Sequence, residues 1–300
     1  MMFGIYRLHG LLDRKNIESV ENLFNRRIDI LSFYLAWNHC RIEDDIHWLS
    51  QLAEAPKQIL LTWEPWRLVE VNKNRHSQPD FSLSSIVSGR YDGYIRDFAR
   101  TLREFLPGIY LRPMHEMNGN WYPWCGTVNG NSPREYRIAW LHLRRLFAEE
   151  RANDINWVWS PYAFSYPPRD ENGLESYFPG DDQLDWVAID GYNWGIDKPG
   201  VGWQRFEDIF TSAYESTGRI SSRPLMIAET GSTERGGAKD IWISEAFASL
   251  ENRFCRIKAL VWFDVDKECD WRIESSAKSL MAFRVAGTRG LTGQAEVIFR

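Results

Sequence analysis

The sequence lacks an excess of basic residues and any long apolar run. Its 36 Lys and Arg stand against 41 Asp and Glu, which leaves a net charge of −5. Nucleic-acid-binding proteins usually carry a basic surface, so we expect no nucleic-acid partner. No run approaches the about 20 apolar residues that cross a bilayer, so we expect no membrane partner. The first six residues also lack the charged start and apolar core of a secretory signal. We expect a cytoplasmic protein, or a secreted one if a leader preceded this sequence.

The common motifs for metals, phosphates and serine nucleophiles are missing as well. The four cysteines, Cys40, Cys125, Cys255 and Cys269, form no C-x-x-C pair. Free buried thiols are therefore expected rather than disulfides or a metal site. The sequence contains no H-E-x-x-H, no P-loop and no G-x-S-x-G elbow. We predict neither a metal nor a cofactor.

Aromatic residues, in contrast, are abundant: the chain has 15 Trp, 12 Tyr and 16 Phe. Trp48, Trp140 and Trp242 fall in helical patterns and are expected in the core. Nine further tryptophans follow strand-like runs: Trp37, Trp63, Trp66, Trp121, Trp124, Trp159, Trp194, Trp262 and Trp271. Amphipathic rings favour half-wet sites and would suit the apolar faces of sugars. This group of rings predicts carbohydrate binding.

Strand-like and helical patterns alternate along the whole chain. The expected strands are Phe3–Tyr6, Ile28–Trp37, Gln58–Trp63, a run from Tyr110 towards Glu116, Ile155–Ser160, Asp185–Tyr192, a run from Pro224 to Glu229, and Lys258–Asp264. Each is followed by a helical pattern, which predicts an α/β fold, a (β/α)8 TIM barrel, as a single domain over residues 1–300. A doubly wound open sheet is the alternative, but no G-x-G-x-x-G follows the first strand.

Two local patterns refine this prediction. Ser132-Pro-Arg-Glu135 has the form of a capping box with proline at the first helical position, so a helix should begin there. The segment 69–90 is polar and irregular, and its length suggests an active-site loop.

Barrel active sites form at the carboxyl ends of the strands. Unusual residues lie at these ends: His9, Trp37, Glu64, Glu116, Trp159, Tyr192, Glu229 and Trp262. Glu116 and Glu229 stand out, because each ends an apolar run and an unpaired buried carboxylate is costly. Glu116 could instead be structural and paired with Arg112. The second glutamate in the same position favours a pair that hydrolyses a glycosidic bond.

The motifs around these glutamates resemble glycoside hydrolase family 26. The run R-P-M-H-E-M-N-G-N-W spans residues 112–121, and I-A-E-T-G spans 227–231. W-V-A-I-D-G-Y-N-W ends at Trp194, and Trp262-Phe-Asp and Asp270-Trp-Arg also look like the family. The resemblance covers nearly the whole chain.

The resemblance implies Glu116 as the general acid/base and Glu229 as the nucleophile. It also implies that four further side chains surround the sugar: His115, Trp121, Tyr192 and Trp262. We expect Asn118, Trp63, Trp194 and Asp264, at the same face, to contact substrate too. Glu116 should be neutral in the free enzyme, and hydrogen bonds from His115 and Tyr192 could keep Glu229 ionised. For His115 to face the pocket beside Glu116, the strand end must be irregular, since strand neighbours point to opposite sides.

The expected function is a retaining endo-β-glycanase that acts by double displacement, with the two carboxyl groups about 5–5.5 Å apart. The resemblance implies β-1,4-mannan as substrate, with mixed-linkage β-1,3-1,4-glucan and β-1,3-xylan as alternatives. One position departs from the family's mannanases, because Phe263 follows Trp262 where they often carry a basic residue. A non-catalytic glycan-binding barrel is the alternative from another class. We expect a monomer whose partner is a β-linked polysaccharide or oligosaccharide.

Overall fold

The structure is a computed structural model that describes residues 1–7, 14–38, 40–55, 57–68 and 77–289. Its eight strands form a closed barrel in the order β1 to β8. The strand pairs with a resolved register are parallel, and helices follow the strands along the chain. The predicted (β/α)8 barrel is confirmed, and the open doubly wound sheet is wrong.

The strands are short and largely buried, as expected for a barrel whose outer face is covered by helices. Their bounds are β1 Met2–Tyr6, β2 Ile30–Ala36, β3 Gln58–Glu64, β4 Ile109–Pro113, β5 Ile155–Trp159, β6 Trp186–Asn193, β7 Leu225–Ser232 and β8 Ile257–Phe263. The predicted strands agree with these to within a few residues. The main difference concerns β4, which ends before Glu116.

The helices are amphipathic and bury one side against the strands. Their bounds are α1 Arg14–Phe24, α2 Ile42–Ala53, α3 Leu83–Val87, α4 Asp92–Phe105, α5 Pro133–Glu149, α6 Phe206–Ile220, α7 Lys239–Asn252 and α8 Ala277–Arg289. Short 3-10 turns are η1 Pro79–Phe81, η2 Asp170–Asn172, η3 Leu174–Tyr177, η4 Asp181–Gln183 and η5 Ile273–Ser275. The predicted cap of α5 is confirmed, because Ser132 Oγ accepts a hydrogen bond from the Glu135 amide.

The segment 69–90 is more ordered than its polar composition suggested. Residues 79–81 form η1 and residues 83–87 form α3, whose first turn is capped by Ser82. Residues 69–76 lie outside the described part of the chain, as does His9. The prediction of an active-site loop therefore stays untested for those positions.

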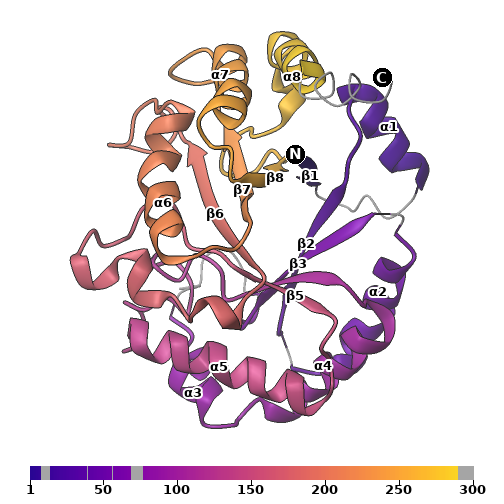
Figure 1. Ribbon diagram of the computed structural model, residues 1–300, viewed down its shortest axis with the longest axis vertical. Coiled ribbons are helices and arrows are strands. Elements are labelled where there is room, and N and C mark those ends of the chain that lie inside the picture. The colour runs from indigo at the N-terminus through magenta and orange to yellow at the C-terminus, as the bar shows by residue number, and fades with distance from the viewer. Residues whose placement is uncertain (8–13, 39, 56, 69–76, 290–300) are drawn as a thin grey trace, which may run out of the picture. The chain divides into compact units, whose positions relative to one another are not determined.

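Contacts between Cα atoms divide the chain into two compact units. The first contains residues 1–32, 189–214 and 224–300, and the second contains 33–188 and 215–223. In the first unit, β1 pairs with β2 and β8, β7 pairs with β8, and α7 packs beside α8 (Figure 1). In the second, β4 pairs with β3 and with β5. Helix α5 packs against α3 and α4 (Figure 1). The prediction of one domain stays a prediction.

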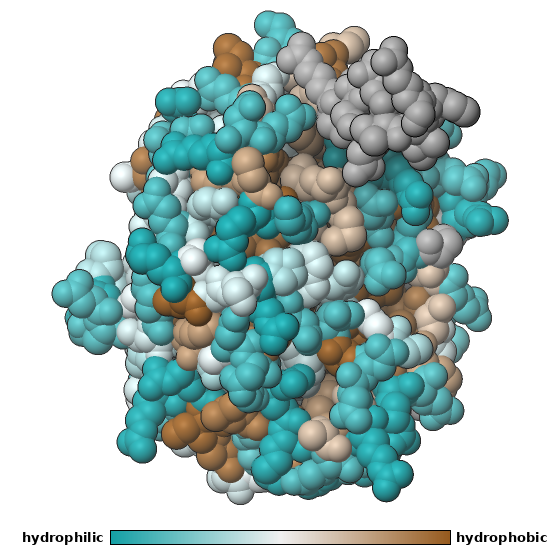
Figure 2. Space-filling view, viewed as in Figure 1, coloured by the Kyte–Doolittle hydropathy of each residue, from teal (hydrophilic) through white to brown (hydrophobic). Residues whose placement is uncertain are grey.

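Hydrophilic residues cover much of the face shown in Figure 2, with smaller hydrophobic areas between them. Among the described residues, no helix combines the length and apolarity needed to cross a bilayer. All four cysteines are free. Cys125 and Cys269 are buried as predicted and Cys40 is half-buried, but Cys255 is exposed, so the expectation of burial was wrong for that residue.

Candidate active site

Glu116 lies three residues beyond β4, in a turn rather than in the strand. Its φ is 53° and that of Met114 is 51°, which places two non-glycine residues in the left-handed region. Such a conformation costs on the order of 1–3 kcal/mol per residue and often marks a functional site. The Glu116 amide donates to the Ser160 carbonyl at 2.7 Å, which ties this turn to the end of β5. The predicted irregularity after the strand is confirmed.

The Glu116 carboxylate lies among aromatic rings, and its residue is only 6% exposed. Its Oε2 accepts a hydrogen bond of 2.6 Å from the Trp121 indole Nε1. The Trp121 ring packs edge-on against Tyr162 at 5.3 Å and at a tilt against Tyr166 at 5.7 Å. Trp121 therefore links the carboxylate to the loop after β5, and its half-buried ring is still accessible to a ligand.

His115 is fully buried within a group of aromatic side chains. Its ring centroid lies 4.8 Å from that of Tyr122, 5.9 Å from Trp124 and 6.1 Å from Tyr34. The Trp124 indole donates to the His115 carbonyl at 2.7 Å, which fixes the backbone beside Glu116. Contact between this imidazole and a substrate stays a prediction.

Asn118 joins the turn after β4 to the loop after β5. Its Nδ2 donates to the Tyr162 carbonyl at 2.9 Å and to Ser165 Oγ at 3.3 Å, and its Oδ1 accepts from the Tyr162 amide at 2.8 Å. The residue is 1% exposed. Both ends of its amide are thus bonded to the loop after β5, and a contact of Asn118 with substrate stays a prediction.

Glu229 lies inside β7, and the register between β7 and β8 shifts between Ile227 and Thr230. Such an irregularity can re-aim a side chain near an active site. Glu229 is 6% exposed, and its Oε2 accepts a hydrogen bond of 2.5 Å from the Tyr192 hydroxyl. The predicted bond from Tyr192 is confirmed. A bond from His115 to Glu229 stays a prediction.

Further aromatic rings adjoin Tyr192, and the prediction included only some of them. Phe263 stacks on Tyr6 at 4.8 Å and meets Tyr192 edge-on at 5.8 Å. Trp271 packs against Tyr192 and Trp194, at 4.9 Å in each case. Trp194 is half-buried, and its contact with substrate stays a prediction. Tyr6, which stacks on Phe263, was not among the predicted residues, although its position at the end of β1 could have indicated it.

Trp262 and Trp63 lie in the core, not at a ligand surface. The Trp262 ring is 0% exposed and contacts Trp242 of α7 and Phe283 of α8. Trp63 is 0% exposed and stacks on Phe98 of α4 at 4.2 Å. Both rings therefore pack between strand and helix, and their predicted substrate contacts are wrong for this structure. Strand neighbours face opposite sides, so Phe263 rather than Trp262 approaches Tyr192.

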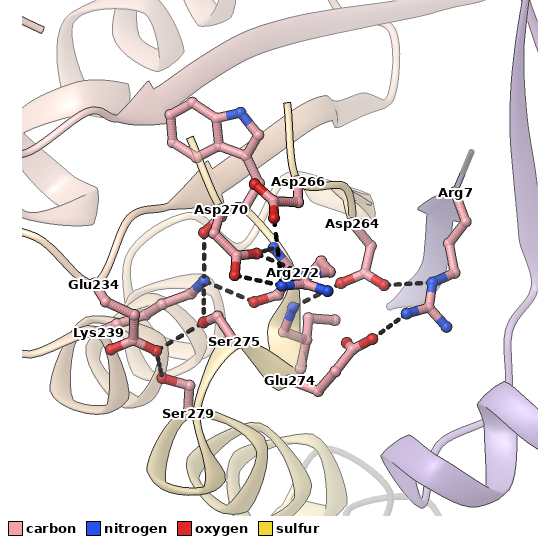
Figure 3. A network of polar contacts seen from close by, with 12 residues as sticks. Arg7, Glu234, Lys239, Asp264, Asp266, Asp270, Arg272, Glu274, Ser275 and Ser279 are labelled. Carbon is pink, nitrogen blue, oxygen red and sulfur yellow. Dashed lines mark hydrogen bonds and ion pairs between the residues drawn. The ribbon is translucent and has the colours of Figure 1, made fainter. Parts of the chain in front are cut away.

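Asp264 belongs to a polar network around the segment after β8 (Figure 3). It pairs with Arg7 Nε at 2.7 Å, and its Oδ1 accepts from the Ile273 amide at 2.6 Å. Burial raises the pKa of Asp264 to about 7, the nearby Glu274 carboxylate adds to the increase, and Arg7 opposes it. The Asp264 carboxylate is thus bonded on both sides and its residue is 2% exposed, and its predicted contact with substrate stays a prediction.

Other carboxylates expected near the site also have partners within the protein. Asp270 accepts two hydrogen bonds from the Arg272 guanidinium, at 2.8 and 2.7 Å. Glu64 accepts from the Trp66 indole at 3.2 Å, and Asp190 is fully buried. No group of three or more His, Cys, Asp or Glu in the described residues is arranged to hold a metal.

Comparisons with known proteins place these features in a family. The model described as "Glycosyl hydrolase family 26" matches residues 82–221. Endoglucanase H of Acetivibrio thermocellus is 33% identical over 279 residues, which cover 90% of this chain and 28% of that protein. Mannan endo-1,4-beta-mannosidase A and B of Caldalkalibacillus mannanilyticus is 36% identical over 91 residues, or 28% of this chain and 16% of that protein. This chain thus spans less than a third of either curated relative.

A solved structure supports the same fold. The catalytic domain of the family 26 endo-β-1,4-mannanase from Bacillus sp. JAMB-750 superposes with a TM-score of 0.66 at 16% identity, covering 95% of this chain and 85% of that one. At this identity the likeness concerns the barrel alone. Together with the motifs around Glu116 and Glu229, the matches in sequence show that this chain belongs to glycoside hydrolase family 26.

Proposed function

We propose that this chain is a glycoside hydrolase that cleaves internal β-linkages of a polysaccharide with retention of configuration. The observation that carries the proposal is a pair of similarly placed carboxylates. Glu116 follows β4 and accepts from Trp121, while Glu229 lies near the end of β7 and accepts from Tyr192. Active sites of these barrels form at the carboxyl ends of the strands, which is where both glutamates occur.

In the first step, a carboxylate oxygen of Glu229 attacks the anomeric carbon. The bond from that carbon to the leaving oxygen breaks, and the leaving oxygen takes the proton of the Glu116 carboxyl group. The Tyr192 hydroxyl suits this role of Glu229, because a bonded donor stabilises the negative charge of the attacking group. The product is a covalent glycosyl ester of Glu229 and a released sugar chain.

In the second step, the Glu116 carboxylate accepts a proton from water while the water oxygen attacks the anomeric carbon. The ester bond to Glu229 breaks, and both glutamates return to their starting protonation states. Glu116 lies in an apolar, aromatic environment that favours the neutral acid before the first step. The Trp121 indole stabilises the carboxylate that forms during that step.

For the substrate we propose a mixed-linkage β-glucan as the first candidate and β-1,4-mannan as the second. Endoglucanase H aligns with 90% of this chain, whereas the mannan-degrading relative aligns with 28%. Phe263 supports the same order, because its uncharged ring stacks on Tyr6 at the position where mannanases were expected to carry a basic residue. The sequence alone placed mannan first.

A panel of soluble glycans tests the reaction and the substrate together. Mixed-linkage glucan, mannan, glucomannan and β-1,3-xylan are incubated with the native protein, and reducing ends and product sizes are measured. Early appearance of mid-sized products would support endo cleavage. Binding of these glycans without any new reducing ends would favour the non-catalytic glycan-binding barrel instead.

The roles of the two glutamates are assigned with azide and an activated aryl β-glycoside. In Glu229→Ala, azide enters from the face opposite the leaving group, and the product is an α-glycosyl azide. In Glu116→Ala, azide attacks the glycosyl ester, and the product is a β-glycosyl azide. Glu251→Ala, on the exposed side of α7, is the matched control and should keep native turnover. Native turnover by Glu229→Ala would contradict the assignment.

A further inference from the structure

Lys239, the first residue of α7, is an unusual residue to find fully buried. Its side chain is 0% exposed, whereas lysines are almost never fully buried unless they are paired. Its Nζ lies 3.2 Å from the Asp270 carbonyl, 2.7 Å from the Arg272 carbonyl and 2.8 Å from Ser275 Oγ (Figure 3). An ammonium group has three N–H donors, so these oxygens can accept all of them.

The two carbonyls belong to the residues on either side of Trp271. The carbonyl of Trp271 itself accepts from the Trp262 indole at 2.8 Å, and its amide donates to the Val265 carbonyl at 2.9 Å. Three successive carbonyls are thus held by two side chains. The backbone that carries the Trp271 ring is fixed from the side of α7 and from β8.

The Trp271 ring in turn contacts both the strand and the partner of Glu229. A Cβ added to Gly231, two residues after Glu229, would lie 3.2 Å from the Trp271 Cβ. The ring also lies 4.9 Å from Tyr192, whose hydroxyl donates to Glu229 at 2.5 Å. A shift of Trp271 would therefore move Tyr192, and with it the hydrogen bond on the carboxylate.

From this chain of contacts we propose that Lys239 is a positioning residue, which holds Trp271 and thereby fixes the Tyr192–Glu229 pair for attack. The proposal rests on the function proposed above, because it assumes that Glu229 is the nucleophile. The residue lies outside the motifs through which the sequence resembles its family, and it touches neither Glu229 nor Tyr192 directly.

The charge around Lys239 explains how an ammonium group is tolerated there. Glu234 accepts from Ser275 Oγ and Ser279 Oγ, each at 2.7 Å, and its carboxylate attracts the lysine (Figure 3). Asp270, Asp264 and Glu274 add smaller attractions. Burial still lowers the pKa of Lys239 to about 8. An apolar residue would leave buried carbonyls without a donor, which is unfavourable.

The test compares Lys239→Met, Lys239→Gln and the native protein, with Arg272→Gln as the control. Arg272→Gln removes the side-chain pair with Asp270 but keeps the Arg272 carbonyl that Lys239 binds. The rate of labelling by a 2-deoxy-2-fluoro glycosyl fluoride is measured, because it reports nucleophilic attack directly, and kcat and KM are measured on the best glycan of the panel.

We expect Lys239→Met to lower the labelling rate and kcat by on the order of 10–100-fold, the effect of a small misplacement of reacting groups, with KM nearly unchanged. Lys239→Gln retains amide donors and should recover part of the loss. The Arg272→Gln control should label at the native rate. If Lys239→Met does not fold, Lys239→Gln and Trp271→Phe are compared with the native protein instead. Both should show a lower kcat with KM nearly unchanged.

The outcomes separate this proposal from the function on which it rests. If the native protein is labelled on Glu229 and the folded Lys239 variants are labelled at the same rate, the positioning role is overturned and the glycosidase proposal stands. A rise in KM with unchanged kcat would overturn it too. If the native protein cleaves no glycan and takes no label, the function itself fails.

Discussion

The Tyr192 hydroxyl donates a 2.5 Å hydrogen bond to Oε2 of Glu229, so a side chain near the end of β6 is bonded to a carboxylate near the end of β7. Both residues are buried. This bond connects the proposed nucleophile to the rings of Phe263, Trp271 and Trp194, which pack around Tyr192. Changes in that aromatic group should therefore alter catalysis through Glu229.

Replacing Tyr192 by Phe removes this bond without changing the ring. A hydrogen bond to a charged group contributes about 1.5–3 kcal/mol, so kcat/KM should fall roughly 10–150-fold. The measurement is initial rates on a soluble glycan. Tyr214→Phe, which removes a hydroxyl on α6, is the control and should retain native rates. Equal rates for native protein and Tyr192→Phe would show that the bond has no part in catalysis.

The decrease in rate caused by removing the Glu116 carboxyl group should depend on the leaving group. Glu116→Ala removes the proposed proton donor, and general acid catalysis contributes about 10²–10⁴-fold. We expect a loss of that size on polysaccharide and a much smaller loss on an aryl glycoside that leaves without protonation. Rates on both substrates are compared with those of Glu104→Ala, an exposed residue of α4. Equal losses on the two substrates would argue against the role of Glu116.

Two tryptophans that were predicted to bind substrate should now behave differently. Trp63→Phe replaces a core indole that stacks on Phe98 with a smaller ring and removes the N–H that donates to Tyr94. It should lower the free energy of unfolding by about 1–3 kcal/mol and leave KM unchanged. Trp194→Ala removes a half-buried ring and should raise KM roughly 2–12-fold. Urea unfolding measures the free energy of unfolding of each variant, and kinetics on a soluble glycan measure KM. A higher KM for Trp63→Phe would indicate that Trp63 contacts substrate.

Asp264 should make stability depend on pH. Its pKa is raised from 3.8 to about 7, mainly by burial, so between these values the native state retains a proton that the unfolded chain has lost. Native stability relative to Asp264→Asn should therefore fall as the pH rises from 3.8 to about 7, and then level off. Urea unfolding of both proteins across this range measures the difference. A difference that stays constant with pH would contradict the raised value.

Lys239 should make the stability of the protein rise with pH, in a range above that of Asp264. Its pKa is lowered from 10.5 to about 8, again mainly by burial. Between these values the unfolded chain keeps a proton that the native state has lost. The stability of the native protein relative to Lys239→Met should therefore increase as the pH rises from about 8 to 10.5. Urea unfolding at several pH values in this window measures it, and a relative stability that falls would exclude the lowered value.

Sequence patterns were reliable where local chemistry decides the structure. The capping box at Ser132 placed the start of α5 correctly, because its hydrogen bond joins residues only three apart. The alternation of strands and helices predicted the barrel, because the hydrophobic periodicity of each segment is also a local property. It also placed Glu116 and Glu229 at strand ends, although Glu116 proved to lie in a left-handed turn beyond β4.

Patterns were less reliable for the direction of side chains. Successive strand residues face opposite sides, but the pattern does not say which of Trp262 and Phe263 faces the helices. Asn118 was assigned to substrate because of its motif, yet its amide bonds to Tyr162, 44 residues away. The local sequence predicts neither the side to which Trp262 points nor the bonds between Asn118 and Tyr162.

The amino-acid sequence by itself determined the barrel, the positions of two strand-end glutamates and the family, since these depend on periodicity and short motifs. Only the tertiary structure decided that Tyr192 bonds Glu229, that Trp262 packs against α7 and α8, and that Lys239 holds the backbone around Trp271. These contacts join residues far apart in the chain, and their geometry depends on how strands and loops pack, which no local pattern encodes.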